Sequence, residues 1–136
     1  MRLWHIDLIP YLPRSQLIAQ WRELNSIFKK QDKHILINYI YNYDKHTLYK
    51  YTNRVLTEMI VRGYKFNNNN YLQYFNSDDD EWIECGLDRF DEHNDEYLTI
   101  CYYNLKEKYI RGQKDFTDDV WKKLDDYYKR RIKNEI

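Results

Sequence analysis

The chain has 136 residues, with 22 basic and 22 acidic side chains, and 18% of its residues are aromatic. This length is enough for a single domain that folds around its own core without disulfide bonds. No apolar run approaches the ~18 residues of a membrane span, and the first residues lack the apolar stretch of a signal peptide, so we expect a cytoplasmic protein.

The two cysteines, Cys85 and Cys101, do not have the close spacing of metal-binding pairs. Zinc sites are usually marked by pairs such as C-x-x-C, so the sequence predicts no zinc site. Reduced thiols in a cytosol are the simpler interpretation.

The zero net charge is the sum of three unequal segments. Residues 1–66 hold eleven basic against five acidic side chains, residues 67–97 hold one against ten, and residues 98–136 hold ten against seven. Phosphate-binding proteins normally carry a basic surface, which the whole chain lacks. The basic surplus instead lies toward the two ends of the sequence, on either side of one acidic segment.

The first helix is predicted over Ser15–Phe28, where apolar residues recur at positions 17, 18, 21, 24, 27 and 28. This repeat gives a helix one buried stripe. Pro10 and Pro13 precede the helix, and Ser15 is a candidate cap for its start. The first dozen residues are therefore expected to form an extended arm.

A second helix is predicted over His46–Arg62, with Asp44 placed to cap its start and Gly63 placed to end it. Between the first two helices, the segment Ile35–Tyr43 contains enough β-branched and aromatic residues to form a short strand as an alternative.

The segment from residue 65 to about 92 is rich in asparagine and aspartate and is expected to be an acidic surface connection, because it has too little apolar area to bury. A third helix is predicted over Asp95–Arg111, and a fourth begins after Thr117, a candidate cap. The sequence thus predicts a single all-α domain over residues 1–136, with three to four helices.

The common catalytic signatures are absent. With only 3 glycines the chain has no glycine-rich phosphate loop, and it contains neither G-x-S-x-G nor H-E-x-x-H. The first helix does present Arg22 and Glu23 beside its apolar stripe. From spacing alone, such a pair is typical of a solvated surface that contributes little energy.

The first helix also carries the pattern Leu17-x-Ala19-x-Trp21-Arg22-Glu23-Leu24-x-x-x-Phe28. Further along lie Lys33-His34, Tyr43-Asp44-Lys45 and Arg62-Gly63-Tyr64, with a weaker similarity at Leu105-Lys106-Glu107-Lys108. In position, order and spacing these motifs resemble the pyrimidine-dimer DNA glycosylase family, whose type member is a bacteriophage endonuclease V. The resemblance leaves out the acidic connection and the last helix.

The resemblance implies an all-α fold with its N-terminal arm packed between helices, and an enzyme that cuts DNA at ultraviolet photoproducts. Family members act first as a glycosylase and then as an AP lyase, through a Schiff base between the free α-amine of the chain and the deoxyribose C1′. This chemistry requires no metal or cofactor. The implied partner is double-stranded DNA with damaged or abasic sites, and we expect the protein to act as a monomer.

The resemblance also assigns catalytic residues. Removal of Met1 before the bulky Arg2 is not expected, so the reactive amine would belong to Met1, about one residue from the family register. Glu23 aligns with the family's catalytic glutamate, which stabilises positive charge on the sugar and handles protons. Arg22 aligns with an arginine that holds DNA phosphate. His5 lies near the reactive end and is a candidate for tuning the amine.

The candidate DNA contacts are basic side chains near the two ends of the sequence. Those near the first helix are Arg2, Arg14, Arg22, Lys29, Lys30, Lys33 and His34. Those from the far end are Arg111, Lys122, Lys129, Arg130 and Arg131. Where the type enzyme has a second arginine one turn beyond the motif, this chain has Ser26.

Two alternatives to the enzyme remain open from the sequence. One is a non-catalytic helical module that keeps the fold and binds nucleic acid or a protein, which Arg2 and the neutral charge favour. The other is an interaction domain whose tyrosines and acidic segment serve a protein partner.

Overall fold

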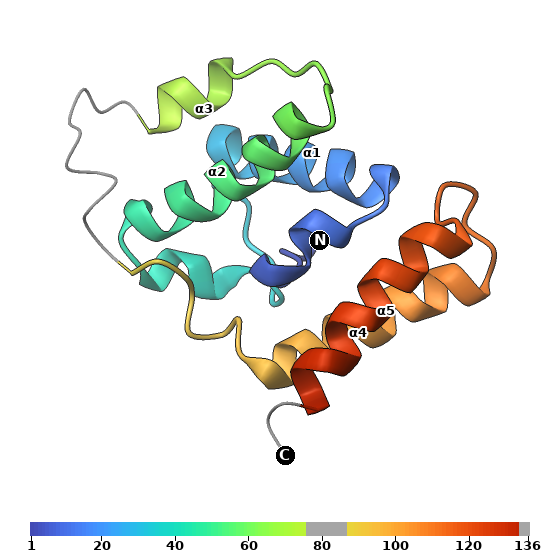
Figure 1. Cartoon of the computed structure of the whole chain (residues 1–136). Coiled ribbons are helices and arrows are strands. Elements are labelled where there is room, and N and C mark those ends of the chain that lie inside the picture. Colours follow the sequence, from blue (N-terminus) through green and yellow to red (C-terminus); the bar gives the residue numbers. More distant parts are fainter. Residues whose placement is uncertain (76–86, 134–136) are drawn as a thin grey trace.

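The computed structural model describes residues 1–75 and 87–133 (Figure 1). Within them lie four long helices, α1 (Arg14–Lys30), α2 (Lys45–Val61), α4 (Asp95–Ile110) and α5 (Asp118–Lys133). Three short elements complete this part of the chain: the 3-10 helices η1 (Ile6–Tyr11) and η2 (Asn38–Asn42), and α3 (Asn69–Tyr74). No strand occurs in these two ranges, so the predicted all-α class is confirmed.

The helix ends follow the local chemistry of the sequence only in part. α2 ends just before Gly63, whose positive φ of 76° favours glycine. Asn94 caps α4 by accepting a hydrogen bond from the Tyr97 backbone N–H at 2.9 Å. The prediction that Ser15 caps the first helix is wrong, because α1 begins after Pro13. Ser15 instead donates its backbone N–H to the Asp115 carboxylate at 2.6 Å.

Two expectations about irregular segments need correction. The alternative strand in Ile35–Tyr43 is wrong, because this segment forms turns followed by η2. The segment from 65 to about 92 contains α3, and its Phe75 and Phe90 are buried, because their aromatic rings supply the apolar area that the surrounding polar residues lack. Residues 76–86 of this segment, which include Cys85, lie outside the described ranges.

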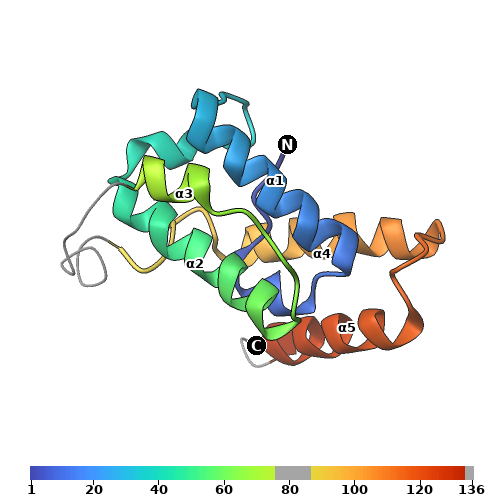
Figure 2. The same ribbon diagram turned by 90° about the horizontal axis from the view of Figure 1, so that it is seen from above.

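The N-terminal arm runs through the middle of the molecule rather than over its surface (Figures 1 and 2). Leu3, His5 and Leu8 are fully buried, and together with the inner faces of the long helices they form one hydrophobic core. The expected arm is therefore present, but residues 6–11 form the 3-10 helix η1 around Pro10 and are not extended. Burying the arm replaces water around its backbone, so its polar groups need partners within the protein.

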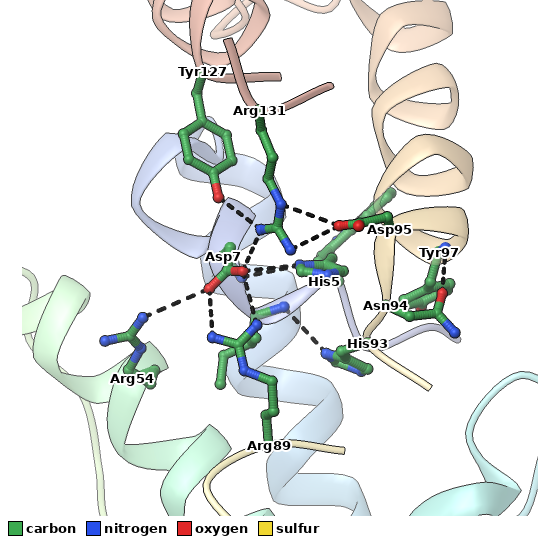
Figure 3. Close-up of polar contacts among 12 residues, drawn as sticks. His5, Asp7, Arg54, Arg89, His93, Asn94, Asp95, Tyr97, Tyr127 and Arg131 are labelled. Carbon is green, nitrogen blue, oxygen red and sulfur yellow. Dashed lines mark hydrogen bonds and ion pairs between the residues drawn. The ribbon is translucent and has the colours of Figure 1, made fainter. Parts of the chain in front are cut away.

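One carboxylate ties the arm to three distant segments (Figure 3). Asp7 accepts hydrogen bonds from Arg89 at 2.8 and 3.0 Å and another from Arg131 of α5, and Arg131 also binds Asp95 at the start of α4. Burial alone would raise the pKa of Asp7, but the hydrogen bonds from Arg89 and Arg131 lower it to about 2. Asp7 is therefore a structural anion that ties η1 to the Arg89 segment and to α5, and Arg131 extends this network to α4 through Asp95.

Two buried histidines lie beside this ion cluster. His93 accepts the backbone N–H of Ile6 at 3.1 Å, and its other ring nitrogen lies 2.7 Å from the Tyr39 hydroxyl. The His5 ring stacks on His93 with centroids 5.5 Å apart. Burial lowers the pKa of His5 to about 4, and burial together with the neighbouring His5 lowers the pKa of His93 to about 3. Both rings are therefore neutral in the folded protein near neutral pH.

Across the described ranges, no helix combines the length and the apolar character needed to cross a bilayer.

The buried histidines should make the fold acid-sensitive. Below their ordinary pKa near 6.5, His5 and His93 take up protons in the unfolded chain but not in the folded one, so acid favours unfolding. We expect the free energy of unfolding to fall between pH 6.5 and about pH 4, by about 1.4 kcal/mol per pH unit for each histidine. Urea unfolding at a series of pH values measures this slope. In His93→Asn the slope should be about half as steep, and an unchanged slope would contradict the assignment.

Candidate functional site

The start of the arm and one face of α1 meet at an open pocket of about 330 Å³. The side chains that line it come from the arm, from α1, from the loop after α1 and from α4. They are Met1, Arg2, Trp4, Gln16, Ala19, Glu23, Leu36, Asn104 and Lys108. The pocket thus brings the first residue of the chain to the same cavity as the glutamate that the sequence analysis selected.

A single buried glutamine fixes the arm against α1. The Gln20 side chain is fully buried and forms hydrogen bonds in both directions with the arm backbone. Its carbonyl oxygen accepts the Trp4 N–H at 2.8 Å, and its amide nitrogen donates to the Arg2 carbonyl at 3.2 Å. The Tyr51 hydroxyl donates to Gln20 at 3.1 Å and to the Trp4 carbonyl at 2.7 Å. These bonds satisfy the arm backbone next to Met1 and set its direction.

Tyr97 holds the opposite side of the arm. Its hydroxyl donates to the Leu3 carbonyl, and its ring faces the Arg2 guanidinium at 5.7 Å. The same guanidinium lies 6.0 Å from the Trp4 ring. The Arg2 side chain is therefore partly engaged by aromatic faces through cation–π contacts while it lines the pocket.

Glu23 is half-buried at the pocket wall. It accepts a hydrogen bond from the backbone N–H of Arg2 and lies near the Met1 ammonium, which acts with Arg22 to favour the carboxylate. Burial has the opposite and larger effect, so the pKa of Glu23 is raised above its ordinary value. Gln20 also approaches the Glu23 carboxylate, at 3.4 Å. A carboxyl of this kind exchanges protons more readily near neutral pH than a fully solvated glutamate.

Met1 remains accessible although the arm behind it is buried. Its side chain is 36% exposed, and its neighbour Arg2 is intermediate in exposure, whereas Leu3 is fully buried. Met1 and Arg2 therefore lie outside the core, and burial begins at Leu3. Met1 and Glu23 thus line one solvent-accessible cavity.

Six pocket residues were not among the predicted site residues: Trp4, Gln16 and Ala19 from the arm and α1, and three from more distant segments. Leu36 lies on the loop after α1, and Asn104 and Lys108 lie one helical turn apart on α4. The i, i+4 spacing of Asn104 and Lys108 was visible in the sequence, but nothing in the sequence indicated that α4 would pass this end of α1.

The predicted basic residues do not all lie together. Arg22, Lys29, Lys30, Lys33 and His34 are all exposed, along α1 and the loop that follows it. None of these five residues lines the pocket itself.

Arg14 belongs elsewhere. It lines a separate cavity of about 370 Å³, where its guanidinium lies 5.2 Å from the Tyr64 ring.

The basic residues of the far end are largely paired within the protein. Arg131 binds Asp7 and Asp95, and Lys129 forms an ion pair with Asp125 at 2.9 Å. Arg111 pairs with Glu107 at 3.2 Å. Arg131 is thus part of the core scaffold and is not placed for a phosphate, because its guanidinium already holds two carboxylates.

His5 does not line the pocket with Met1. It is fully buried, and its Nδ1 accepts the backbone N–H of Asp7 at 3.1 Å. The structure therefore places this histidine in the core, beside His93 and the Asp7 cluster (Figure 3).

Within residues 1–75 and 87–133, no three histidine, cysteine, aspartate or glutamate side chains come together as potential metal ligands.

Comparison with known proteins places this geometry in a family. Residues 1–72, which contain the arm, α1, the following loop and α2, match the family model described as pyrimidine dimer DNA glycosylase. No curated protein and no solved structure matches the chain. The matched region includes Met1 and Glu23 but not α4 or α5.

The role of Gln20 can be tested through stability. Gln20→Leu keeps the side-chain volume but leaves the buried Trp4 N–H and Arg2 carbonyl without this partner, so we expect a loss of about 2 kcal/mol in the free energy of unfolding. Hydrogen exchange at the amides of residues 2–5 should also become faster. Gln73→Leu, at an exposed position of α3, is the matched control and should change the stability by less than about 0.5 kcal/mol. Equal stabilities of the two variants would argue against the anchoring role.

Proposed function

Because this chain belongs to the pyrimidine dimer DNA glycosylase family, we propose that it is a DNA repair glycosylase and AP lyase whose nucleophile is the α-amine of Met1. Its substrate is double-stranded DNA that carries a pyrimidine dimer or an abasic site. Glu23 is the acid–base residue of the reaction.

The observation that carries the proposal is the shared pocket of Met1 and Glu23. The Met1 ammonium lies close enough to Glu23 to favour its carboxylate, and the cavity around both is open to solvent. The family register would place the amine one residue further along the chain. Gln20, Tyr51 and Tyr97 hold the arm so that Met1 itself reaches the pocket.

The proposed reaction begins at the sugar of the damaged nucleotide. The neutral amine of Met1 attacks C1′, and the glycosidic C1′–N bond breaks, with the base leaving with the bonding pair and gaining a proton. The amine loses a proton, the C1′–O4′ bond opens, and O4′ takes up a proton, which leaves an imine between Met1 and C1′. Removal of a C2′ proton then expels the 3′ phosphate oxygen with the C3′–O bonding pair, and water releases the product from Met1.

Glu23 contributes in both of its protonation states. As a carboxylate it stabilises the positive charge that develops at C1′ and accepts the C2′ proton, and as an acid it delivers the proton to O4′. Its raised pKa supports this alternation, because burial brings the two states closer in free energy near neutral pH. The Arg2 backbone and the Met1 ammonium both favour its carboxylate form.

The basic residues around the pocket supply the DNA contacts. Arg22, Lys29, Lys30 and Lys33 are exposed on α1 and its following loop, where phosphates can reach them. Lys108 reaches the pocket from α4 and is suited to the phosphate next to the lesion. These local charges allow a neutral chain to bind DNA, since phosphate contacts depend on the charge near the interface.

The chemistry predicts a covalent intermediate at a defined atom. With duplex DNA that carries one abasic site, borohydride should reduce the imine and leave the DNA attached to the Met1 amine, as read by mass spectrometry of the N-terminal peptide. Glu23→Gln should slow strand nicking at least about 10²-fold, because it removes the proton transfers. Glu96→Gln, an exposed glutamate in the first turn of α4, is the matched control and should nick at the wild-type rate.

Blocking the amine separates this mechanism from the alternatives. A variant with two residues placed before Met1 should form no adduct at the pocket and should lose nicking. An adduct on a lysine side chain would assign the nucleophile elsewhere. Salt-sensitive DNA binding with no adduct on either abasic or dimer-containing DNA would instead establish the non-catalytic nucleic-acid-binding module.

The DNA contacts predict a change in salt dependence. Arg22→Gln and Lys33→Gln should each lower the slope of log K against log salt by about 0.9, since each removes one phosphate contact. Lys133→Gln is the control, because the C-terminal end of α5 lies away from the N-terminus in both views (Figures 1 and 2). Fluorescence anisotropy with undamaged duplex DNA between 50 and 200 mM salt gives these slopes. A slope that stays the same in all three variants would mean that DNA binds elsewhere.

A further inference from the structure

We propose that Ile35 and Leu36 form an apolar wedge that enters the base stack of duplex DNA at the lesion, next to the Met1–Glu23 pocket. This inference rests on the proposed function, because it assigns a way for a buried lesion to reach the amine. Enzymes that act on a nucleotide inside a duplex must first unstack it, and apolar side chains inserted between base steps are one means of doing so.

Ile35 is the starting observation. Its side chain is 85% exposed, the highest value among the large hydrophobic side chains in the described ranges. Burial of an isoleucine side chain stabilises a protein, so the exposure of Ile35 forgoes that stabilisation in the free protein. The apolar face of an unstacked base pair would recover it.

The loop that carries Ile35 is fixed by hydrogen bonds on both sides of it. The His34 N–H donates to the Asn38 side chain at 2.7 Å, and the Leu36 N–H donates to His34 Nδ1 at 3.1 Å. The His34 carbonyl accepts the Ile37 and Asn38 backbone N–H groups at 2.8 and 2.9 Å. Ile37 is fully buried and anchors the turn in the core. The hydrogen-bonded turn thus fixes the backbone at Ile35, so binding requires little further ordering of the loop.

The loop also places Ile35 next to the pocket of Met1 and Glu23. Leu36, the next residue, is 40% exposed and lines the same pocket as Met1 and Glu23. Both views place the marked N-terminus beside the loop that follows α1 (Figures 1 and 2). A wedge at Ile35 would therefore open the duplex within reach of the amine.

The charged residues next to Ile35 in the sequence fit a nucleic-acid duplex rather than a protein groove. Lys29, Lys30 and Lys33 are exposed just before Ile35. The one carboxylate among them, Asp32, accepts a hydrogen bond from Ser26 Oγ. An exposed apolar side chain preceded by three lysines suits a base stack flanked by phosphates.

The wedge can be measured at equilibrium, without the chemistry. A duplex with a tetrahydrofuran abasic analogue and 2-aminopurine on the opposite strand reports unstacking as a rise in fluorescence on binding. We expect the wild-type protein to raise the fluorescence at saturation, Ile35→Ser to abolish most of that rise, and Ile35→Leu to retain it. Ile60→Ser is the matched control, because Ile60 is an isoleucine of α2 that is 63% exposed and does not line the pocket.

The second readout compares two substrates of the trapping reaction. A single strand with an abasic site has no base pairs to open, so Ile35→Ser should lower the ratio of duplex to single-strand adduct formation at least about tenfold. Circular dichroism checks that the variant is folded. Wild-type fluorescence and an unchanged ratio in Ile35→Ser would overturn the wedge while leaving the enzyme intact. Absence of any wild-type adduct would overturn the proposed function, and the fluorescence measurement would still decide on the wedge.

Discussion

The burial of the N-terminal arm is the constraint on which the rest of this structure depends. A chain segment removed from water must find a partner for each backbone N–H and C=O group, and a helix or sheet would supply them by itself. Before η1 the arm forms neither, so side chains do this work: Gln20 and Tyr51 bind the backbone on one side, and Tyr97 and His93 on the other. The aromatic richness of the chain thus supplies hydroxyl groups as well as apolar area, and the directions of these groups determine where the first amine lies.

The sequence predicted the regular part of this fold well and the irregular part poorly. Apolar repeats at helical spacing located α1, α2, α4 and α5 to within a few residues, because each buries one stripe against the same core. The 3-10 helices and α3 were missed, because their conformation depends on contacts with distant segments. Phe75 and Phe90 illustrate this: each lies in a polar stretch that appeared too hydrophilic to pack, yet each is buried.

The candidate site, too, was predicted only in part. Residues selected through the family resemblance, Met1 and Glu23, lie in one pocket, and that pairing depends on the arm and on α1, which share the matched region. Lys108 and Leu36 were not selected, because their approach to the pocket is a result of tertiary packing. Arg131 was selected for its charge but is held by Asp7, since composition does not distinguish a free guanidinium from one that already has a buried partner.

The tie between Asp7 and Arg131 spans 124 residues of sequence. During synthesis the arm leaves the ribosome before α5, which follows only after the other described helices have been made. The arm must therefore remain exposed, or be covered provisionally, until α5 arrives and Asp7 gains this partner. The pocket that Met1 and Glu23 share therefore reaches its defined geometry only after α5 has been made, although both residues are synthesised much earlier.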